Sequence, residues 1–148
     1  FTMRTGGRTF EAAAFLRRSG ADTAEVKKLF QNDLEDTIAK YSIIQNAHLY
    51  REHIAVAVSA KPVGRVIAAQ AADELLNIIG IDASFVLAPD GDTVNISARS
   101  MGDVNVQVVL EALGGGGNAA AAGGQVTGKS IEDVARELMQ AIDQYLEG

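Results

Sequence analysis

The sequence predicts an α/β fold, in which a mixed β-sheet is flanked by helices and preceded by a helical connector. Three observations predict it. About fifty residues at the start carry only helical periodicity. Beyond them, short β-branched segments alternate with helical segments rich in alanine and leucine. Two of the strand-like segments are separated by a turn that contains Asp-Gly, which indicates an antiparallel hairpin within the sheet.

The connector is predicted over residues 1–52, and the sheet domain over residues 53–148. Apolar residues at helical spacing follow Thr9, and Gly20 is a stop signal. Asp22 then has the pattern of an N-cap, with an acidic residue three positions later. A long helix is predicted over residues 33–51, with a stripe made of Leu34, Ile38, Tyr41, Ala47 and His48.

The first half of the sheet domain alternates strands and a helix. Residues 54–59, IAVAVS, are short, apolar and β-branched, which predicts a buried strand. A loop over residues 61–64 leads to a helix over residues 66–79 that Gly80 ends. Residues 83–88, ASFVLA, predict a second strand, followed by a turn over residues 89–92 that is longer than two residues.

Residues 93–100, TVNISARS, give the clearest strand pattern. Val94, Ile96 and Ala98 alternate with polar residues, so one face is predicted to enter the core and the other to be polar. The polar face comprises Thr93, Asn95, Ser97 and Arg99.

The end of the chain is predicted to hold two more helices. Asp103 is the predicted N-cap of a helix over residues 104–113, and a short strand is expected around Gln125. Ser130 is the predicted N-cap of the last helix, with Asp133 in the reciprocal position. The apolar face of that helix comprises Ile131, Val134, Leu138, Ile142 and Tyr145.

Composition limits the possible ligands. The net charge is -6, which argues against sequence-independent binding of long nucleic acid, because such binding needs a dense positive surface. A small phosphate ligand needs only one or two arginines and some backbone N–H groups. With no cysteine, disulfides and thiolate metal sites are excluded. No apolar run approaches the roughly 20 residues that span a bilayer.

Residues 114–124, GGGGNAAAAGG, form the most unusual segment. Residues 123–130, GGQVTGKS, match the Walker A pattern, but they follow low-complexity sequence rather than a core strand, and a single helix follows them. The glycine-rich segment is also poorly explained as a flexible linker, because the chain that follows it is too short to form a separate domain. Consecutive glycines within a domain serve either as a turn or as a cradle for an anion, and both interpretations stay open.

Arg99 lies at the end of the predicted polar strand face. A surface ion pair is the ordinary explanation for one arginine. Ser97, Ser100 and Asn105 are expected near the same sheet edge, which favours a small-molecule site there. His48 and His53 have no helical pair spacing and no carboxylates arranged around them, so neither predicts a metal site. No catalytic constellation is predicted.

Four short motifs occur in a fixed order: R-T-F-E-A-A, S-A-R-S, N-V-Q and G-G-G-G. With them, nearly the whole chain resembles the C-terminal part of the DHH phosphoesterase superfamily, and within it the bacterial cyclic-di-AMP phosphodiesterases. The resemblance implies that this chain is a DHH-associated domain that holds the nucleotide. It also implies that a preceding DHH domain, absent from this chain, binds two manganese ions that activate water. By itself the chain is then expected to be inactive.

The resemblance also implies roles for individual residues. Arg99 and Ser100 would contact phosphate or nucleotide, and Asn105 would support the loop or touch the ligand. The four glycines, Gly114, Gly115, Gly116 and Gly117, would present backbone N–H groups to it. The family motif continues with a histidine, whereas Asn118 stands here. Either the histidine is replaced, or a few loop residues are missing from the chain as printed.

The expected partners are a cyclic dinucleotide or short oligonucleotide and the DHH domain of the parent chain, in the cytoplasm, with no direct membrane contact by this part. Three alternatives remain. The parent could act on oligoribonucleotides, single-stranded DNA or polyphosphate. The domain could be a non-catalytic RNA- or nucleotide-binding module, against which the acidic charge counts. It could also be a homodimerisation module built on the long helix.

Overall fold

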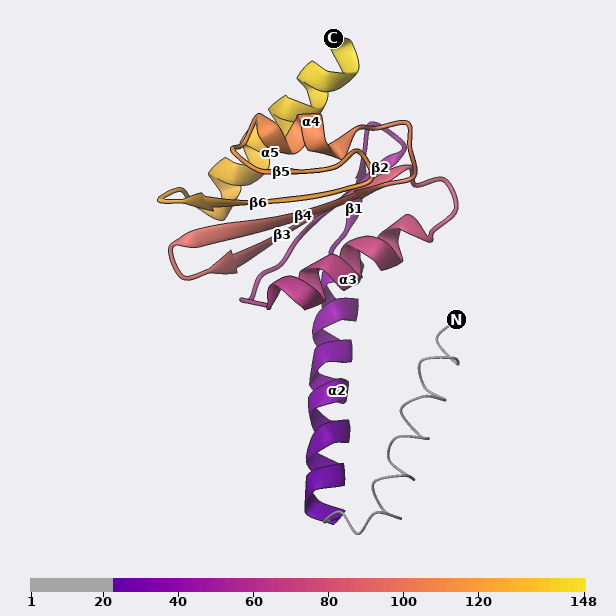
Figure 1. Cartoon of the computed structure of the whole chain (residues 1–148), viewed down its shortest axis with the longest axis vertical. Coiled ribbons are helices and arrows are strands. Elements are labelled where there is room, and N and C mark those ends of the chain that lie inside the picture. Colours follow the sequence, from indigo (N-terminus) through magenta and orange to yellow (C-terminus); the bar gives the residue numbers. More distant parts are fainter. Residues whose placement is uncertain (1–22) are drawn as a thin grey trace. The chain divides into compact units, whose positions relative to one another are not determined.

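The structure is a computed structural model that describes residues 23–148, with side chains from residue 34 onward (Figure 1). The predictions of a helix ending at Gly20 and of an N-cap at Asp22 lie outside these residues. Ala39–Gly148 form one compact unit. No helix in the described range is long and apolar enough to cross a membrane.

Helix α2 (Thr23–Gln45) ends earlier than predicted. Its N-terminal part was predicted from a stripe that includes Leu34 and Ile38, but both are 59% exposed. Among residues 34–45 of α2, whose side chains are described, the buried one is Ile43, at 2% exposure, and it belongs to the apolar cluster formed with α3. The helical periodicity identified the apolar positions of the helix, but it could not show which of them pack against the rest of the domain. The predicted helix was also too long, since His48 lies in strand β1.

The sheet has six strands in the order β1-β2-β3-β4-β6-β5 (Figure 1). The strands are β1 (His48–Tyr50), β2 (Ile54–Val58), β3 (Ala83–Asp90), β4 (Thr93–Ser100), β5 (Gly116–Gly117) and β6 (Ala121–Thr127). Strands β2 and β3 are parallel, whereas the other neighbours are antiparallel. The predicted mixed sheet is therefore confirmed.

The hairpin between β3 and β4 is tighter than the sequence predicted. Asp90 pairs with Thr93, so Gly91 and Asp92 alone form the loop. Gly91 has φ 62°, the positive value that a two-residue hairpin loop requires. Pro89 belongs to β3 rather than to the turn, at a position where the strand approaches its end.

Three helices pack on this sheet. Helix α3 (Arg65–Leu76) ends before the predicted Ile79. Helix α4 (Val106–Glu111) is capped by Asn105 instead of Asp103, because the Asn105 side chain accepts hydrogen bonds from the second and third backbone N–H groups that follow it. Helix α5 (Ile131–Glu147) begins as predicted, with the Ser130 hydroxyl accepting from the Asp133 N–H at 3.1 Å.

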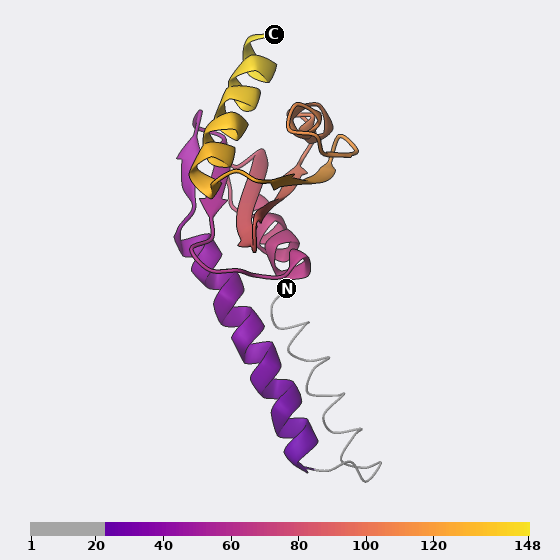
Figure 2. The same ribbon diagram turned by 90° about the vertical axis from the view of Figure 1, so that its left-hand side faces the viewer.

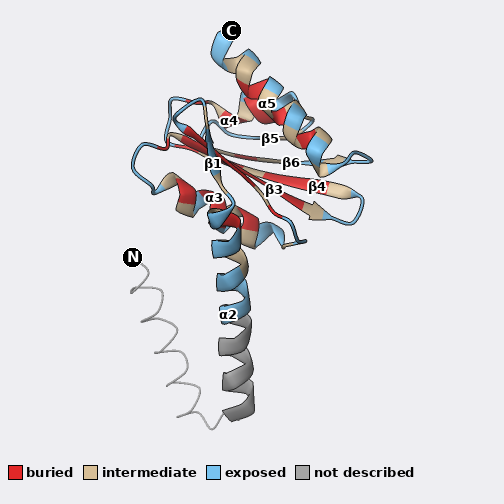
Figure 3. Cartoon of the chain, turned by 180° about the vertical axis from the view of Figure 1, so that it is seen from behind, coloured by how far each residue is buried: buried red, intermediate tan, exposed pale blue. Residues whose placement is uncertain are grey.

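The helices divide between the two faces of the sheet (Figures 1 and 2). Helices α4 and α5 cover one face, where Phe85, Ile96 and Leu138 belong to a large buried cluster. Helix α3 covers the other face, where Ala57, Val86 and several alanines of α3 form a smaller cluster. Buried residues accordingly gather in the central strands and on the inner sides of α3 and α5 (Figure 3).

Candidate functional site

A pocket of about 700 Å³ lies on the α3 side of the sheet. Its size falls in the range of small-molecule sites. The start of α3 contributes Arg65 and Ala69, strands β4 and β6 contribute the floor, and the glycine run contributes the opposite side. The lining residues are Arg65, Ala69, Asn95, Ile96, Ser97, Arg99, Gly114, Gly115, Gly116, Gly117, Ala121, Ala122, Gly123, Gly124 and Gln125.

The floor of the pocket follows from the register of β4 with β6. Asn95 pairs with Gln125, Ser97 pairs with Gly123, and Arg99 pairs with Ala121. Directly opposed residues of antiparallel strands present their side chains on the same face. At two of these positions β6 carries only glycine or alanine, so the space above the floor stays open.

Arg99 is held in place at one end of this floor. Its Nε donates to Asp73 Oδ1 at 2.9 Å, and its Nη1 donates to the Ala98 carbonyl at 2.8 Å. The Arg99 side chain is 23% exposed. A guanidinium carries five N–H donors, so the remaining donors can serve a bound anion. Asp73, from α3, thus fixes the orientation of the arginine.

Arg65, Asn95 and Gln125 meet at the other end. With its amide oxygen facing Arg65, Gln125 accepts a hydrogen bond from Arg65 Nε at 3.2 Å. The same oxygen lies 3.1 Å from Asn95 Oδ1. Asn95 is only 4% exposed, so this polar group is buried at the edge of the pocket. Sequence reasoning placed Asn95 on a polar face but gave no role to Arg65 or Gln125.

The glycine run serves the fold at three of its four positions. Gly114 has φ 84° and donates to the Glu111 carbonyl, while Gly115 donates to the Leu110 carbonyl at 2.8 Å. A side chain at Gly115 would collide with the backbone of Gly123, and one at Gly117 with that of Ala121. The N–H groups of Gly114 and Gly115 are therefore already paired with the end of α4.

Gly116 differs from its neighbours. Its φ is not positive, and a Cβ added to it would meet no atom within 4 Å. It lines the pocket nonetheless. The fold of this chain therefore gives no reason for the absence of a side chain at Gly116, whereas close approach of a ligand to the backbone would give one.

The other three predicted site residues do not line the pocket. The Ser100 hydroxyl accepts from the Gly102 N–H at 3.1 Å, and Asn105 caps α4. Asn118 Oδ1 accepts from the N–H groups of Ala120 and Ala121, both at 2.9 Å, and so closes the turn between β5 and β6. Each of the three side chains stabilises the backbone around the pocket.

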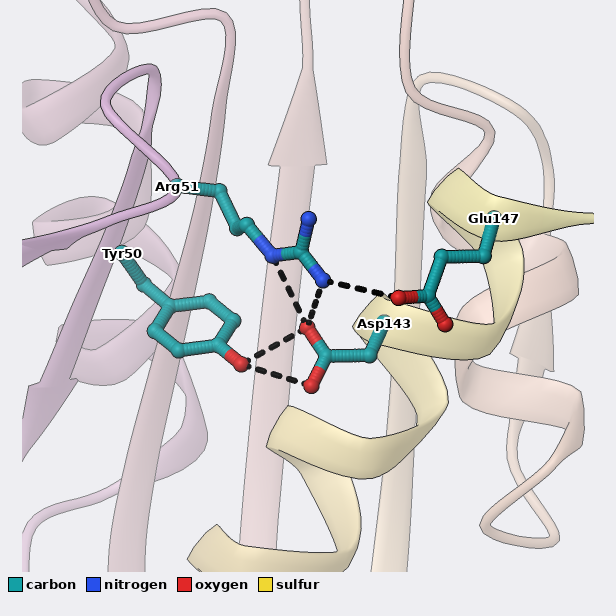
Figure 4. A network of polar contacts seen from close by, with 4 residues as sticks. All are labelled: Tyr50, Arg51, Asp143 and Glu147. Carbon is teal, nitrogen blue, oxygen red and sulfur yellow. Dashed lines mark hydrogen bonds and ion pairs between the residues drawn. The ribbon is translucent and has the colours of Figure 1, made fainter.

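A second polar cluster joins the end of β1 and the turn after it to α5 (Figure 4), and its residues are not among those that line the pocket. The Tyr50 hydroxyl donates to Asp143 at 2.7 Å, and Arg51 Nη2 lies 2.9 Å from Asp143 and 3.4 Å from Glu147. The hydrogen bond from Tyr50, and then the contacts with Arg51, lower the pKa of Asp143 below its ordinary value of 3.8. The same bond raises the pKa of Tyr50. Arg51, within this cluster, has a positive φ of 57°.

Neither histidine belongs to a metal site in the described part of the chain. His53 Nδ1 lies 3.3 Å from the Gly80 carbonyl and so connects two loops. No group of three or more His, Cys, Asp or Glu side chains is arranged to hold a metal ion within residues 34–148.

Comparison with known proteins agrees with this architecture. A family model described as the DHHA1 domain matches residues 51–148. The chain is 44% identical over 153 aligned residues to the cyclic-di-AMP phosphodiesterase GdpP of Bacillus subtilis and 42% identical over 152 to the cyclic-di-AMP phosphodiesterase PdeA of Listeria monocytogenes. All of this chain is covered in both cases, but it spans only 23% of either relative.

Two solved structures share the fold. An exopolyphosphatase-related protein from Bacteroides fragilis has a TM-score of 0.67 at 20% identity, over 88% of this chain and 41% of that one. The pGpG-specific phosphodiesterase PggH from Vibrio cholerae has a TM-score of 0.54 at 18% identity, over 81% of this chain and 43% of that one. At these identities the likeness concerns the fold alone.

Proposed function

The chain belongs to the DHHA1 domain family, and we propose that it is the nucleotide-binding region of a phosphodiesterase that hydrolyses cyclic di-AMP or a short linear dinucleotide. One observation carries the proposal: Arg99 and the four glycines, which are distant in the sequence, line one pocket. The relatives' names supply the substrate class, and the pocket supplies the means of binding it.

In this proposal, Arg99 binds a phosphate group of the ligand. Asp73 holds one edge of the guanidinium, and the free donors form charge-assisted hydrogen bonds to phosphate oxygens. The glycine at position 116 lets the ligand approach the backbone closely. Ser100, Asn105 and Asn118 hydrogen-bond to backbone N–H groups in the turns around the pocket. In this proposal they affect ligand binding indirectly, by holding that backbone in position.

Hydrolysis of a phosphodiester by this family's metal-dependent route would need metal-ligating side chains in addition to those described here. The described residues do not fit a manganese site, because they bring no three metal-ligating side chains together. We therefore assign this chain the binding step, with the metal-dependent step in a DHH domain of the parent protein. A cytoplasmic location and a homodimer are part of the same proposal.

Calorimetric titration of the 148-residue chain tests the binding role. The chain is titrated with cyclic di-AMP and with its linear product, and the titration is repeated with Arg99→Ala. Loss of hydrogen bonds to a charged group costs about 1.5–3 kcal/mol, which corresponds to a loss of affinity of about ten- to a hundredfold.

Arg136→Ala is the matched control, because it removes the same charge from an exposed position on α5, where the arginine pairs with Asp133 and does not line the pocket. We expect its affinity to equal that of the unaltered chain. Equal affinity in Arg99→Ala, or an unaltered chain that binds neither nucleotide, would overturn the proposal.

A further inference from the structure

We propose that Arg65 forms a second anion-binding position in the pocket, which takes the terminal phosphate of a linear dinucleotide while Arg99 takes the internal phosphodiester. This inference rests on the proposed function, in which Arg99 binds phosphate. It gives a role to a pocket residue that the proposed function does not use. It also predicts that the pocket selects dinucleotides by whether they carry a terminal phosphate.

The two guanidinium groups are anchored at opposite ends of the pocket floor. Arg99 is held by Asp73, and Arg65 precedes Asp73 by eight residues on α3, which is about 12 Å at the rise of a helix. Arg65 contacts Gln125, which pairs with Asn95. Along β4, Asn95 lies four residues from Arg99, or about 14 Å. One phosphate group is too small to reach both anchors, so a ligand that uses both needs two separate anionic groups.

The two arginines differ in how far their positive charge is already neutralised. Arg99 forms an ion pair with Asp73 at 2.9 Å, whereas the oxygen that Arg65 contacts belongs to the neutral amide of Gln125. None of the ion pairs within residues 34–148 involves Arg65. A phosphodiester carries one negative charge, but a terminal phosphate carries about −1.5 to −2 near neutral pH. The more highly charged phosphate therefore matches the arginine without an acidic partner.

Gln125 acts as a positioning residue for Arg65. Its oxygen accepts from Arg65 Nε at 3.2 Å and also from Nη2, so it holds one edge of the guanidinium beside β6. A guanidinium has five N–H donors, and the donors away from this edge can bind a phosphate. Arg65 is exposed and lines the pocket, so a ligand that enters from solvent can reach it. The amide thus orients the guanidinium without cancelling its charge.

The experiment compares two ligands that differ in one group: linear diadenylate with a 5′-terminal phosphate, and the same dinucleotide without that phosphate. Calorimetric titrations use the 148-residue chain and Arg65→Gln, which removes the charge from an exposed position. We expect the unaltered chain to bind the phosphorylated ligand about tenfold more tightly, the lower end of what hydrogen bonds to charged groups provide. In Arg65→Gln the two affinities should become equal, while the affinity for the unphosphorylated ligand stays the same.

Two further variants and a change of salt serve as controls. Arg65→Lys keeps a positive charge and should keep part of the preference. Arg136→Gln removes a charge from an exposed position outside the pocket lining and should keep all of it. A higher salt concentration tests the unaltered chain itself. The preference should shrink there, because salt screens the attraction between the exposed Arg65 and the terminal phosphate.

Arg99→Ala separates this inference from the proposed function. We expect it to weaken both ligands and to leave the preference in place. If it changes neither affinity, or if the unaltered chain binds neither ligand, the proposed function fails and this inference fails with it. If Arg99→Ala weakens both ligands but Arg65→Gln retains the preference, only the assignment of Arg65 fails. Equal binding of both ligands by the unaltered chain, or a preference that salt does not reduce, also overturns that assignment.

Discussion

The two faces of the sheet differ in what covers them, although strand β4 contributes to both. On one face, Val94, Ile96 and Ala98 are buried beneath α4 and α5. On the other, Asn95, Ser97 and Arg99 line an open pocket, because α3 lies beside them and β6 offers small residues. Under the proposed function, alternate residues of this one strand serve stability on the covered face and ligand binding on the open face. Changes on the covered face should lower stability, and changes on the open face should lower affinity.

The largest effect is expected on the covered face from Leu138→Ala. Leu138 of α5 is fully buried in the large cluster, so truncation leaves a cavity. We expect the free energy of unfolding to fall by about 2–5 kcal/mol, measured by urea denaturation. Under conditions where the variant remains folded, its affinity for the linear dinucleotide should be unchanged. A large loss of affinity in folded Leu138→Ala would show that the two faces are coupled.

The glycine run gives a sharper comparison within one short segment. Gly115→Ala forces a methyl group against the backbone of β6, so stability should fall by about 1–3 kcal/mol. Gly116→Ala meets open space, so its melting temperature should match that of the unaltered chain. Its affinity for dinucleotide should nevertheless fall by about tenfold, equivalent to about 1.4 kcal/mol. If Gly116→Ala binds normally, close backbone approach at that position is not used.

The smallest effect is expected in the cluster of Tyr50, Arg51 and Asp143, from Asp143→Asn, and it depends on pH. The pKa of Asp143 is lowered in the folded state, chiefly by the hydrogen bond from Tyr50. The stabilisation is therefore fully present above the unfolded value of 3.8 and is lost as pH falls through the lower folded value.

Melting temperatures of both forms, measured from neutral to strongly acidic pH, check this expectation. The unaltered chain should melt slightly higher at neutral pH, and the difference should shrink below pH 3.8. A difference that grows on acidification would contradict the assignment. Dinucleotide affinity at neutral pH should not change, because this cluster lies outside the pocket lining.

Local patterns predicted strands β2, β3 and β4 well, missed β1 and β5, and placed the helix boundaries poorly. The alternation in residues 93–100 located β4, and the Asp-Gly signal located its hairpin. Helix α2 was extended over His48 because helical spacing alone does not show where a strand begins to pair. Asp103 was chosen as a cap because both Asp103 and Asn105 are suitable residue types, and the backbone geometry decided for Asn105.

The pocket could be predicted only in part. The sequence related Arg99 to the glycine run through a family resemblance, and the structure places both at one cavity. Gln125 was overlooked because its position depends on the register of β6 against β4. Arg65 was overlooked because nothing in the sequence distinguishes a basic residue at the start of a helix. Its contact with Gln125 is visible only in the folded structure. The binding roles of these residues stay predictions.

The parallel pairing of β2 with β3 has a consequence for which parts of the chain can vary in length. Parallel neighbours require a crossover connection, and α3 is that connection, so the fold cannot lose it. The loop over residues 59–64 that precedes α3 is under no such constraint. A change in the length of this loop would move Arg65, at the start of α3, relative to Gln125 on β6, while the paired strands of the core stay in register.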